Sequence, residues 1–190
     1  MIELNNMTIA QFDEWVPTAD EGFIYELHDG VVYAFASGSA SHGRLCMRLG
    51  VWLYPQVKAP CEVFLGSLPV RRHPERPSSV IPDALVTCEM PPAGQIFATA
   101  PKLVVEVISP TSVVNDLIRK PRLYNAVPSI EEYLVVDSRS MWARVFRRNA
   151  AGELPAEGEG LAAADSTIEL QSVGLTFKLG DLYANILEPA

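Results

Sequence analysis

The sequence is poor in cysteine and contains no long apolar run. Its only cysteines are Cys46, Cys61 and Cys88, which lie far apart and form no C-x-x-C pair. We therefore expect neither a disulfide scaffold nor a structural zinc site. No run reaches the length of about 18 apolar residues that a transmembrane helix needs. Residues 1–4 lack the basic and apolar regions of a signal peptide, so a cytoplasmic location is expected.

Basic residues are missing from one end of the chain and scarce at the other. Residues 1–30 contain no Lys or Arg and carry a net charge of −7, and residues 149–190 carry −6. Residues 31–148 carry +5, which leaves −8 for the whole chain. The total argues against a strongly basic nucleic-acid-binding protein. The central excess is either solvated surface charge or a phosphate-binding face whose acidic flanks lie elsewhere.

The composition is that of a globular protein. Hydrophobic residues make up 48% and charged residues 20% of 190 positions. This length suits one domain with a sizeable core, so we predict a single domain over residues 1–190. Residues 149–166 are rich in Ala, Gly and Glu, which indicates a mobile loop within it.

Local patterns predict an α/β (α+β) fold with a mixed sheet. Thr8 and Gln11 form a capping-box pattern at the start of a short helix. Asp29-Gly30 lies between two alternating apolar runs, which is typical of a β-hairpin. The remaining expected elements are a helix over 41–56, strands over 62–70, 81–88 and 102–108, a helix capped by Ser109 or Thr111, paired strands over 133–137 and 142–146, a strand over 174–179 and a helix over 181–187.

Two acids interrupt otherwise apolar strands. Asp83 follows Pro82, and Glu106 lies within the apolar run 103–108. A buried carboxylate is costly unless it is paired, hydrogen-bonded or bound to a metal. Asp83 is therefore either a strand-entry cap or a ligand, and Glu106 is either an ion-pair partner of a Lys or Arg or a ligand.

The register of these two strands helps to distinguish the alternative interpretations of Asp83 and Glu106. If they pair antiparallel around the Pro/Gly loop 90–94, Cys88 faces Pro101 and Asp83 faces Glu106. Directly opposed side chains have Cβ atoms about 5 Å apart. Two carboxylates at that separation repel each other, and a hard cation such as Mg²⁺ or Mn²⁺ would relieve the repulsion.

An ordered series of motifs then resembles the Uma-two family of restriction endonucleases. The series runs Tyr25-Glu26-Leu27-His28-Asp29-Gly30, His42, Pro82-Asp83, Leu103-Val104-Val105-Glu106-Val107-Ile108-Ser109-Pro110, Asp116, Lys120, Tyr124 and Glu132-Tyr133-Leu134-Val135-Val136-Asp137. The resemblance spans nearly the whole chain. It implies a restriction-endonuclease-like, PD-(D/E)XK fold with a mixed central sheet flanked by helices, an N-terminal hairpin and extra C-terminal strands. It also implies metal-dependent phosphodiester hydrolysis.

The resemblance assigns roles to three residues. Asp83 and Glu106 would ligate Mg²⁺ or Mn²⁺, and Lys120 would act as catalytic base or charge stabiliser. The basic residue of the nuclease pattern usually stands two places after the second acid, where this chain has Ile108. Lys120, on the following helix, fits the substitute position. Pro121 departs from the family pattern, because proline disfavours a helical conformation at the preceding residue.

Two further residues, Glu26 and His42, are weaker site candidates, and Asp116 is interpreted as a structural residue. Glu26 is either a third acid for the metal or a solvent-facing hairpin acid. His42 either contacts phosphate and the site or caps a helix. Asp116 either caps a helix or pairs with Lys120 at the i,i+4 spacing.

The expected partner is nucleic acid, with DNA as the first choice and a membrane excluded. Arg71, Arg72 and Arg76 form the densest basic cluster, which is either a set of phosphate contacts or a solvated loop. The expected activity is that of a Mg²⁺-dependent endodeoxyribonuclease. The alternatives are a nuclease fold that binds DNA without cutting it, or a protein-interaction module. A homodimer is compatible with each.

Overall fold

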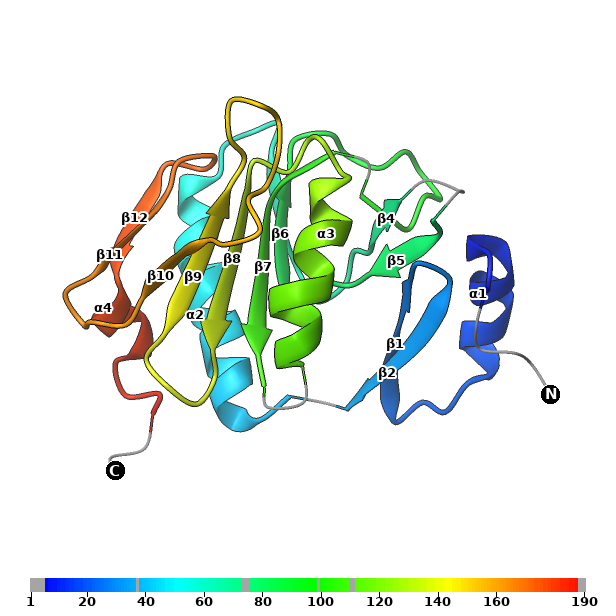
Figure 1. The fold of residues 1–190 in the computed structure, drawn as a ribbon, viewed down its shortest axis with the longest axis horizontal. Coiled ribbons are helices and arrows are strands. Elements are labelled where there is room, and N and C mark those ends of the chain that lie inside the picture. Colours follow the sequence, from blue (N-terminus) through cyan, green and yellow to red (C-terminus); the bar gives the residue numbers. More distant parts are fainter. Residues whose placement is uncertain (1–5, 37, 73–75, 99, 110–111, 188–190) are drawn as a thin grey trace.

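The computed structural model describes residues 6–36, 38–72, 76–98, 100–109 and 112–187, and its strands form three sheets (Figure 1). The central sheet has six strands in the order β10-β9-β8-β7-β6-β3. Strands β7 and β8 run parallel and the other neighbours run antiparallel, so the predicted mixed α/β fold is confirmed. Within the described ranges, no helix is long and apolar enough to cross a membrane.

The elements follow one another along the chain as coloured in Figure 1. They are α1 (Ile9–Trp15), η1 (Val16–Thr18), β1 (Phe23–His28), β2 (Val31–Ala36), α2 (Ala40–Gln56), β3 (Glu62–Leu65), β4 (Val70–Arg72), β5 (Ser78–Val80), β6 (Ala84–Thr87), β7 (Pro101–Ile108), η2 (Asn115–Arg119), α3 (Lys120–Asn125), β8 (Glu132–Asp137), β9 (Ala143–Arg147), β10 (Glu159–Leu161), β11 (Thr167–Leu170), β12 (Leu175–Lys178) and α4 (Leu179–Tyr183).

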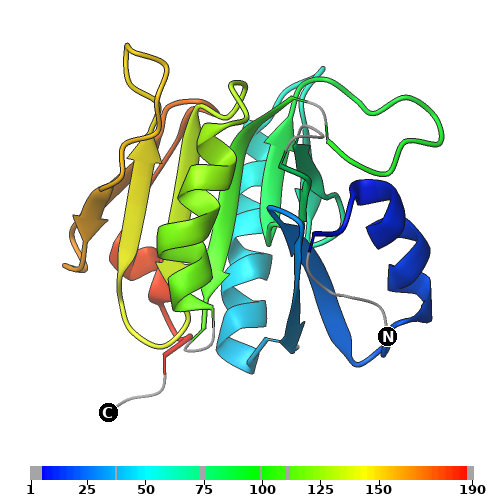
Figure 2. The ribbon, with the colours of Figure 1, turned by 45° about the vertical axis from the view of Figure 1, so that its right-hand side comes forward.

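Helices cover both faces of the central sheet. Helix α2 packs Leu49 and its neighbours against one face of β7, which includes Val105. Helix α3 lies on the opposite face of the sheet (Figures 1 and 2). Its Tyr124 packs there with Val104 of β7. Side chains alternate between the faces of a strand. Glu106 therefore points to the α3 face, where it is 3% exposed.

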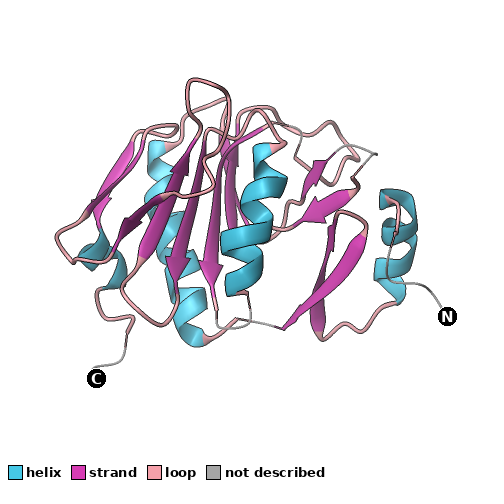
Figure 3. Ribbon diagram, viewed as in Figure 1, coloured by secondary structure: helices cyan, strands magenta, loops and turns pink. Residues whose placement is uncertain are grey.

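The C-terminal segment packs beside α2 on the same face of the central sheet. Strands β11 and β12 form a two-stranded sheet of their own, and α4 follows directly (Figure 3). Ile168 and Leu182 are buried in the same core as Leu49. The predicted loop over 149–166 is wrong in part, because β10 lies within it and pairs with β9.

The N-terminal hairpin forms as predicted and joins a separate sheet. Asp29 and Gly30 have φ angles of 48° and 83°, the left-handed conformation that a tight hairpin turn requires. Strand β1 then pairs with β5 through Leu27 and Ser79, which builds the sheet β2-β1-β5-β4. This pairing brings the hairpin alongside the end of β6 and positions Glu26 near the central sheet.

The predicted register of β6 and β7 is confirmed over three pairs and then shifts. Ala84 pairs with Val105, so the next residue outward, Asp83, lies in line with Glu106. A bulge after Val86 places Thr87 opposite Pro101. The expected pairing of Cys88 with Pro101 is therefore wrong.

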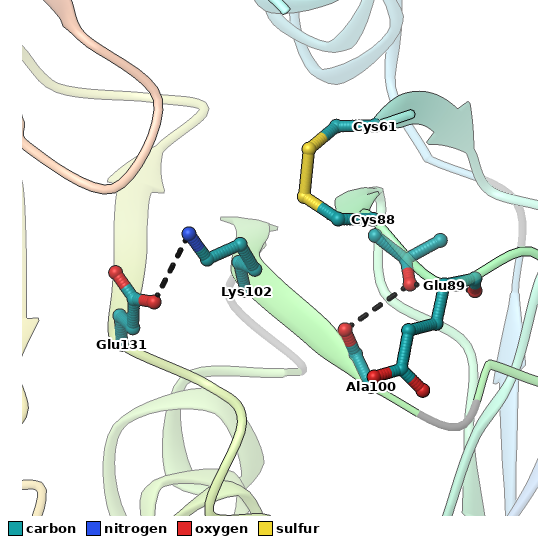
Figure 4. Close-up of a disulfide and its surroundings, with 7 residues drawn as sticks. Cys61, Cys88, Glu89, Ala100, Lys102 and Glu131 are labelled. Atoms are coloured by element: carbon teal, nitrogen blue, oxygen red, sulfur yellow. Dashed lines mark hydrogen bonds and ion pairs between the residues drawn. A yellow bond between two sulfur atoms is a disulfide. The ribbon is translucent and has the colours of Figure 1, made fainter. Parts of the chain in front are cut away.

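A disulfide joins Cys61 to Cys88, although no disulfide scaffold was expected from the sequence (Figure 4). Strands β3 and β6 pair Glu62 with Thr87, so the next positions outward bring the two cysteines face to face. The separation of 27 residues hides this proximity in the sequence. Disulfides persist mainly in oxidising compartments, so cysteine usage does not support the cytoplasmic location, which stays a prediction.

A π-helical turn precedes α3 and accommodates Pro121. The Lys120 N–H donates to the Asn115 carbonyl five residues back, and Lys120 has helical φ and ψ angles of −61° and −37°. The prediction that Pro121 disfavours a helical Lys120 is therefore wrong. The wider turn relieves the clash that a proline ring makes with the preceding turn of a regular helix. The proposed helix cap Thr111 lies outside the described residues.

Candidate active site

A cavity of about 270 Å³ opens where the hairpin, the start of α2 and the ends of β6 and β7 meet η2 and α3. Every residue that the sequence placed at a catalytic or metal position lines it. These residues are Asp83, Glu106 and Lys120, with the weaker candidates Glu26 and His42. The structure therefore brings together side chains that are up to 94 positions apart in the sequence.

Lys120 lies at the centre of the polar cluster. Its Nζ is 2.8 Å from Glu106 Oε1, 3.1 Å from Asp116 Oδ1 and 3.3 Å from Glu26 Oε1. The residue is only 4% exposed. Burial alone would lower the pKa of Lys120, but the three carboxylates outweigh it and raise that pKa well above its usual value. Lys120 therefore stays protonated at neutral pH.

Glu106 faces Lys120 from the middle strand. Its Oε1 accepts hydrogen bonds from Lys120 Nζ and from the Tyr124 hydroxyl, which is 2.7 Å away. Burial raises the pKa of Glu106 well above its usual value, and the neighbouring carboxylates of Asp116 and Asp83 add to the rise while Lys120 opposes it. The positive charge of Lys120 therefore does not fully compensate the ionised form of Glu106.

Asp83 stands at the entry to β6 and bonds in two directions. Its Oδ2 accepts the Val107 N–H at 2.7 Å, which ties it to β7. Its Oδ1 lies 3.2 Å from His42 Nε2 on α2. This hydrogen bond raises the pKa of His42, against the effect of burial. Asp83 therefore holds the backbone of β7 in place, as a strand-entry cap does. It also presents its carboxylate to the cavity.

Glu26 is a buried site residue and not a solvent-facing hairpin acid. It is 2% exposed. Its Oε1 accepts the Ile81 N–H at 2.9 Å, and its Oε2 lies 2.8 Å from His28 Nε2. Burial alone would raise the pKa of Glu26, but Lys120 and His28 together lower it. Glu26 therefore carries a stable negative charge beside Lys120.

Helical spacing brings two further groups to the site. Asp116, Lys120 and Tyr124 are four residues apart, so they share one helix face. The predicted i,i+4 pair of Asp116 and Lys120 is confirmed. Burial raises the pKa of Asp116, partly offset by Lys120. Tyr124 is buried in the core, and its hydrogen bond to Glu106 was not predicted from the sequence. The i,i+4,i+8 spacing was the available signal.

The cluster contains more acids than bases. Four carboxylates, those of Glu26, Asp83, Glu106 and Asp116, line the cavity with the single ammonium of Lys120. Both hydrogen bonds that the described residues donate to Glu106 end on Oε1, which leaves Oε2 for another partner. Carboxylate oxygens are the ligands that Mg²⁺ and Mn²⁺ prefer. The residues present therefore fit a hard divalent cation.

Arg71 and Arg76 are not among the residues that line the cavity. The Arg71 guanidinium donates to both carboxylate oxygens of Asp13 on α1 and lies 4.8 Å from the centre of the Phe97 ring. Arg76 is exposed, and the side chain of Arg72 is outside the described part of the chain. The expected phosphate contacts of Arg71, Arg72 and Arg76 remain a prediction.

The sequence matches a family model over most of its length. Residues 9–179 match the Uma2 model, which is described as "Putative restriction endonuclease". The chain belongs to the Uma2 family. Two residues that the family resemblance singled out, Glu106 on β7 and Lys120 on α3, form a direct ion pair. Ile108, which occupies the position where the nuclease pattern usually has a basic residue, is buried.

Two cyanobacterial relatives have similar sequences. The uncharacterized protein slr1290 of Synechocystis sp. (strain ATCC 27184 / PCC 6803 / Kazusa) is 30% identical over 167 residues, which is 85% of this chain and 84% of the relative. The uncharacterized protein sll1609 of the same strain is 29% identical over 116 residues, which is 59% of this chain and 65% of the relative.

The fold also resembles a solved structure. The crystal structure of a putative nuclease belonging to DUF820 from Anabaena variabilis ATCC 29413 aligns with a TM-score of 0.74 and 18% sequence identity. The alignment covers 92% of this chain and 98% of that chain. At this identity the likeness establishes a common fold.

Proposed function

We propose that this Uma2 protein is a metal-dependent endonuclease that hydrolyses phosphodiester bonds, with DNA as its substrate. One observation carries the proposal. Asp83 and Glu106 lie in register at the end of β6 and within β7, and both line a cavity centred on a buried lysine. The description of the Uma2 family supports the same activity.

Asp83 and Glu106 would hold the cation. A bound Mg²⁺ or Mn²⁺ would lower the pKa of a water ligand and neutralise charge on the scissile phosphate. Glu106 can offer Oε2 while Tyr124 and Lys120 hold Oε1 in place. Asp83 offers Oδ1 while the Val107 N–H holds Oδ2.

Lys120 suits charge stabilisation better than proton abstraction. A general base must be neutral before it accepts a proton, and the raised pKa of Lys120 keeps its ammonium charged. A fixed, buried positive charge stabilises negative charge that develops on a phosphate. Glu26 and Asp116 act as positioning residues, because each holds the ammonium in place.

A binding module without cleavage is the second candidate. Ile108 occupies the usual position of the basic residue, and the chain carries a net charge of −8. This function would give salt-dependent DNA binding without turnover, because phosphate contacts release counterions.

The test is a cleavage assay on supercoiled plasmid, single-stranded DNA and RNA with Mg²⁺ or Mn²⁺. Wild type is compared with Glu106→Gln. Glu132→Gln is the matched control, because Glu132 is also a buried strand glutamate but binds Arg147 and Ser172 outside the cavity. We expect metal-dependent cleavage by wild type and by the control, and a loss of at least about 100-fold in Glu106→Gln. Binding without cleavage by wild type would favour the second candidate.

A further inference from the structure

One group of side chains at the edge of the cavity differs chemically from the acid cluster. His42 and Cys46 are one turn apart on α2, and both face Asp83. The His42 Nε2, as noted, lies 3.2 Å from Asp83 Oδ1, and Cys46 Sγ lies 3.5 Å from His42 Nδ1. One ligand atom from each of the three residues can be chosen so that all lie within 4.8 Å of one another.

These distances suit a small ion after modest side-chain movement. Metal bonds of about 2.0–2.3 Å in a tetrahedral site separate the ligand atoms by about 3.3–3.8 Å. The His42 and Asp83 side chains are 21% and 23% exposed, so an aqueous ion can reach them. His42 and Asp83 are part of the cavity lining, so a solvent ligand could complete the coordination from the cavity.

The ligand atoms of His42, Cys46 and Asp83 favour a different ion from the one that the acid cluster favours. Imidazole and thiolate ligands favour Zn²⁺ and similar transition ions, whereas Mg²⁺ takes oxygen ligands. We propose that His42, Cys46 and Asp83 form a second cation site, which binds Zn²⁺ or a similar borderline-soft ion. Binding breaks the Cys46 S–H bond, forms a metal–sulfur bond and releases the proton to solvent.

The two sites share Asp83. An ion held by His42 and Cys46 would draw this carboxylate away from a cation at Glu106. Zn²⁺ at low concentration should therefore inhibit the Mg²⁺-dependent cleavage, a consequence that rests on the proposed function. The binding site itself rests only on the arrangement of the three side chains.

Co²⁺ is the probe for this site, because a thiolate ligand gives it a characteristic near-ultraviolet charge-transfer absorption. The Cys61→Ser/Cys88→Ser variant of the 190-residue chain retains Cys46 as its sole thiol. We expect this absorption to saturate at one Co²⁺ per chain and Zn²⁺ to abolish it. Adding His42→Ala should weaken Co²⁺ binding at least about tenfold, and adding Cys46→Ser should remove the absorption. Absence of the absorption, or its persistence at full affinity in His42→Ala, would overturn the proposal.

A second measurement uses the wild-type protein with its disulfide intact. Here Cys46 is the free thiol, and equimolar Zn²⁺ should slow its reaction with a thiol reagent at least about tenfold. Unchanged reactivity would contradict the proposal. Glu106→Gln separates this site from the proposed nuclease centre, because it should keep the Zn²⁺ effect while losing Mg²⁺ binding. Loss of both in Glu106→Gln would mean that no separate site exists.

Discussion

The Nζ of Lys120 lies 2.8 Å from Oε1 of Glu106, and this ion pair joins α3 to the middle of β7. Both residues are buried, and the same ammonium also faces Asp116 and Glu26. Lys120 therefore contributes both to the stability of the fold and to the proposed activity.

Replacing Lys120 with Met should affect both. It leaves three buried carboxylates without their shared cation, and breaking a buried ion pair costs about 3–5 kcal/mol. Cleavage should fall at least about 100-fold, since the fixed charge beside the phosphate is lost. Divalent cations should still bind and recover part of the lost stability. Chemical unfolding with and without Mg²⁺ tests this. An unchanged turnover number in a folded Lys120→Met protein would contradict the role of Lys120.

Stability without divalent cations should fall as pH rises from about 5 to about 8. Burial raises the folded-state pKa values of Glu106 and Asp116, and the bond to Asp83 raises that of His42. Within this range the folded state holds more protons than the unfolded state, so raising the pH destabilises it. Thermal unfolding across this range measures the slope.

Two comparisons sharpen this pH test. Glu106→Gln should reduce the slope, because a neutral amide replaces a group that resists ionisation. Mg²⁺ should raise the melting temperature most at the upper end of the range, where the carboxylates are ionised. A wild-type slope of opposite sign would contradict the assignment of raised pKa values.

Arg71 and Arg76 should differ in function. Arg71 pairs with Asp13, so Asp13→Ala should cost up to about 1 kcal/mol of stability. Arg71→Ala should cost more, because it also loses the contact with Phe97, and the double mutant should be little worse than Arg71→Ala. If Arg76 contacts phosphate, Arg76→Ala should lower the salt dependence of DNA binding by about one unit of the log–log slope. A salt slope altered by Arg71→Ala and not by Arg76→Ala would reverse the assignment.

The disulfide should contribute measurably to stability. Closing a loop between Cys61 and Cys88 restricts the unfolded chain, and native disulfides contribute about 2–4 kcal/mol. Reduction of wild type should lower the free energy of unfolding by about this amount. The Cys61→Ser/Cys88→Ser protein should be insensitive to the reductant. If Cys46→Ser abolished the reductant effect and the double change did not, a different pairing would be indicated.

Short-range signals predicted much of the fold. The capping box of Thr8 and Gln11 forms as expected, and so does the turn at Asp29-Gly30. Each of these signals acts within a few residues. The alignment of Asp83 with Glu106 was also predicted, although the pairing of Cys88 with Pro101 from which it was counted does not form, because a bulge after Val86 shifts the register there.

Features that depend on distant pairing were not predictable. Cys61 meets Cys88 only because β3 pairs with β6, and Glu26 is buried only because β1 pairs with β5. The helical Lys120 was missed because a single sequence gives no indication of a π-turn before Pro121. The acids of the candidate site were recognisable as residues, but the contacts of Lys120 with three of them required the folded chain.

Calorimetric titration with Mn²⁺ tests the central claim most directly, because it needs no knowledge of the nucleic-acid substrate. Wild type, Glu106→Gln and the matched control Glu132→Gln are titrated under the same conditions. The account predicts binding by wild type and by the control, with affinity reduced at least about 100-fold in Glu106→Gln. Equal Mn²⁺ affinity in all three proteins would contradict a metal centre at Glu106.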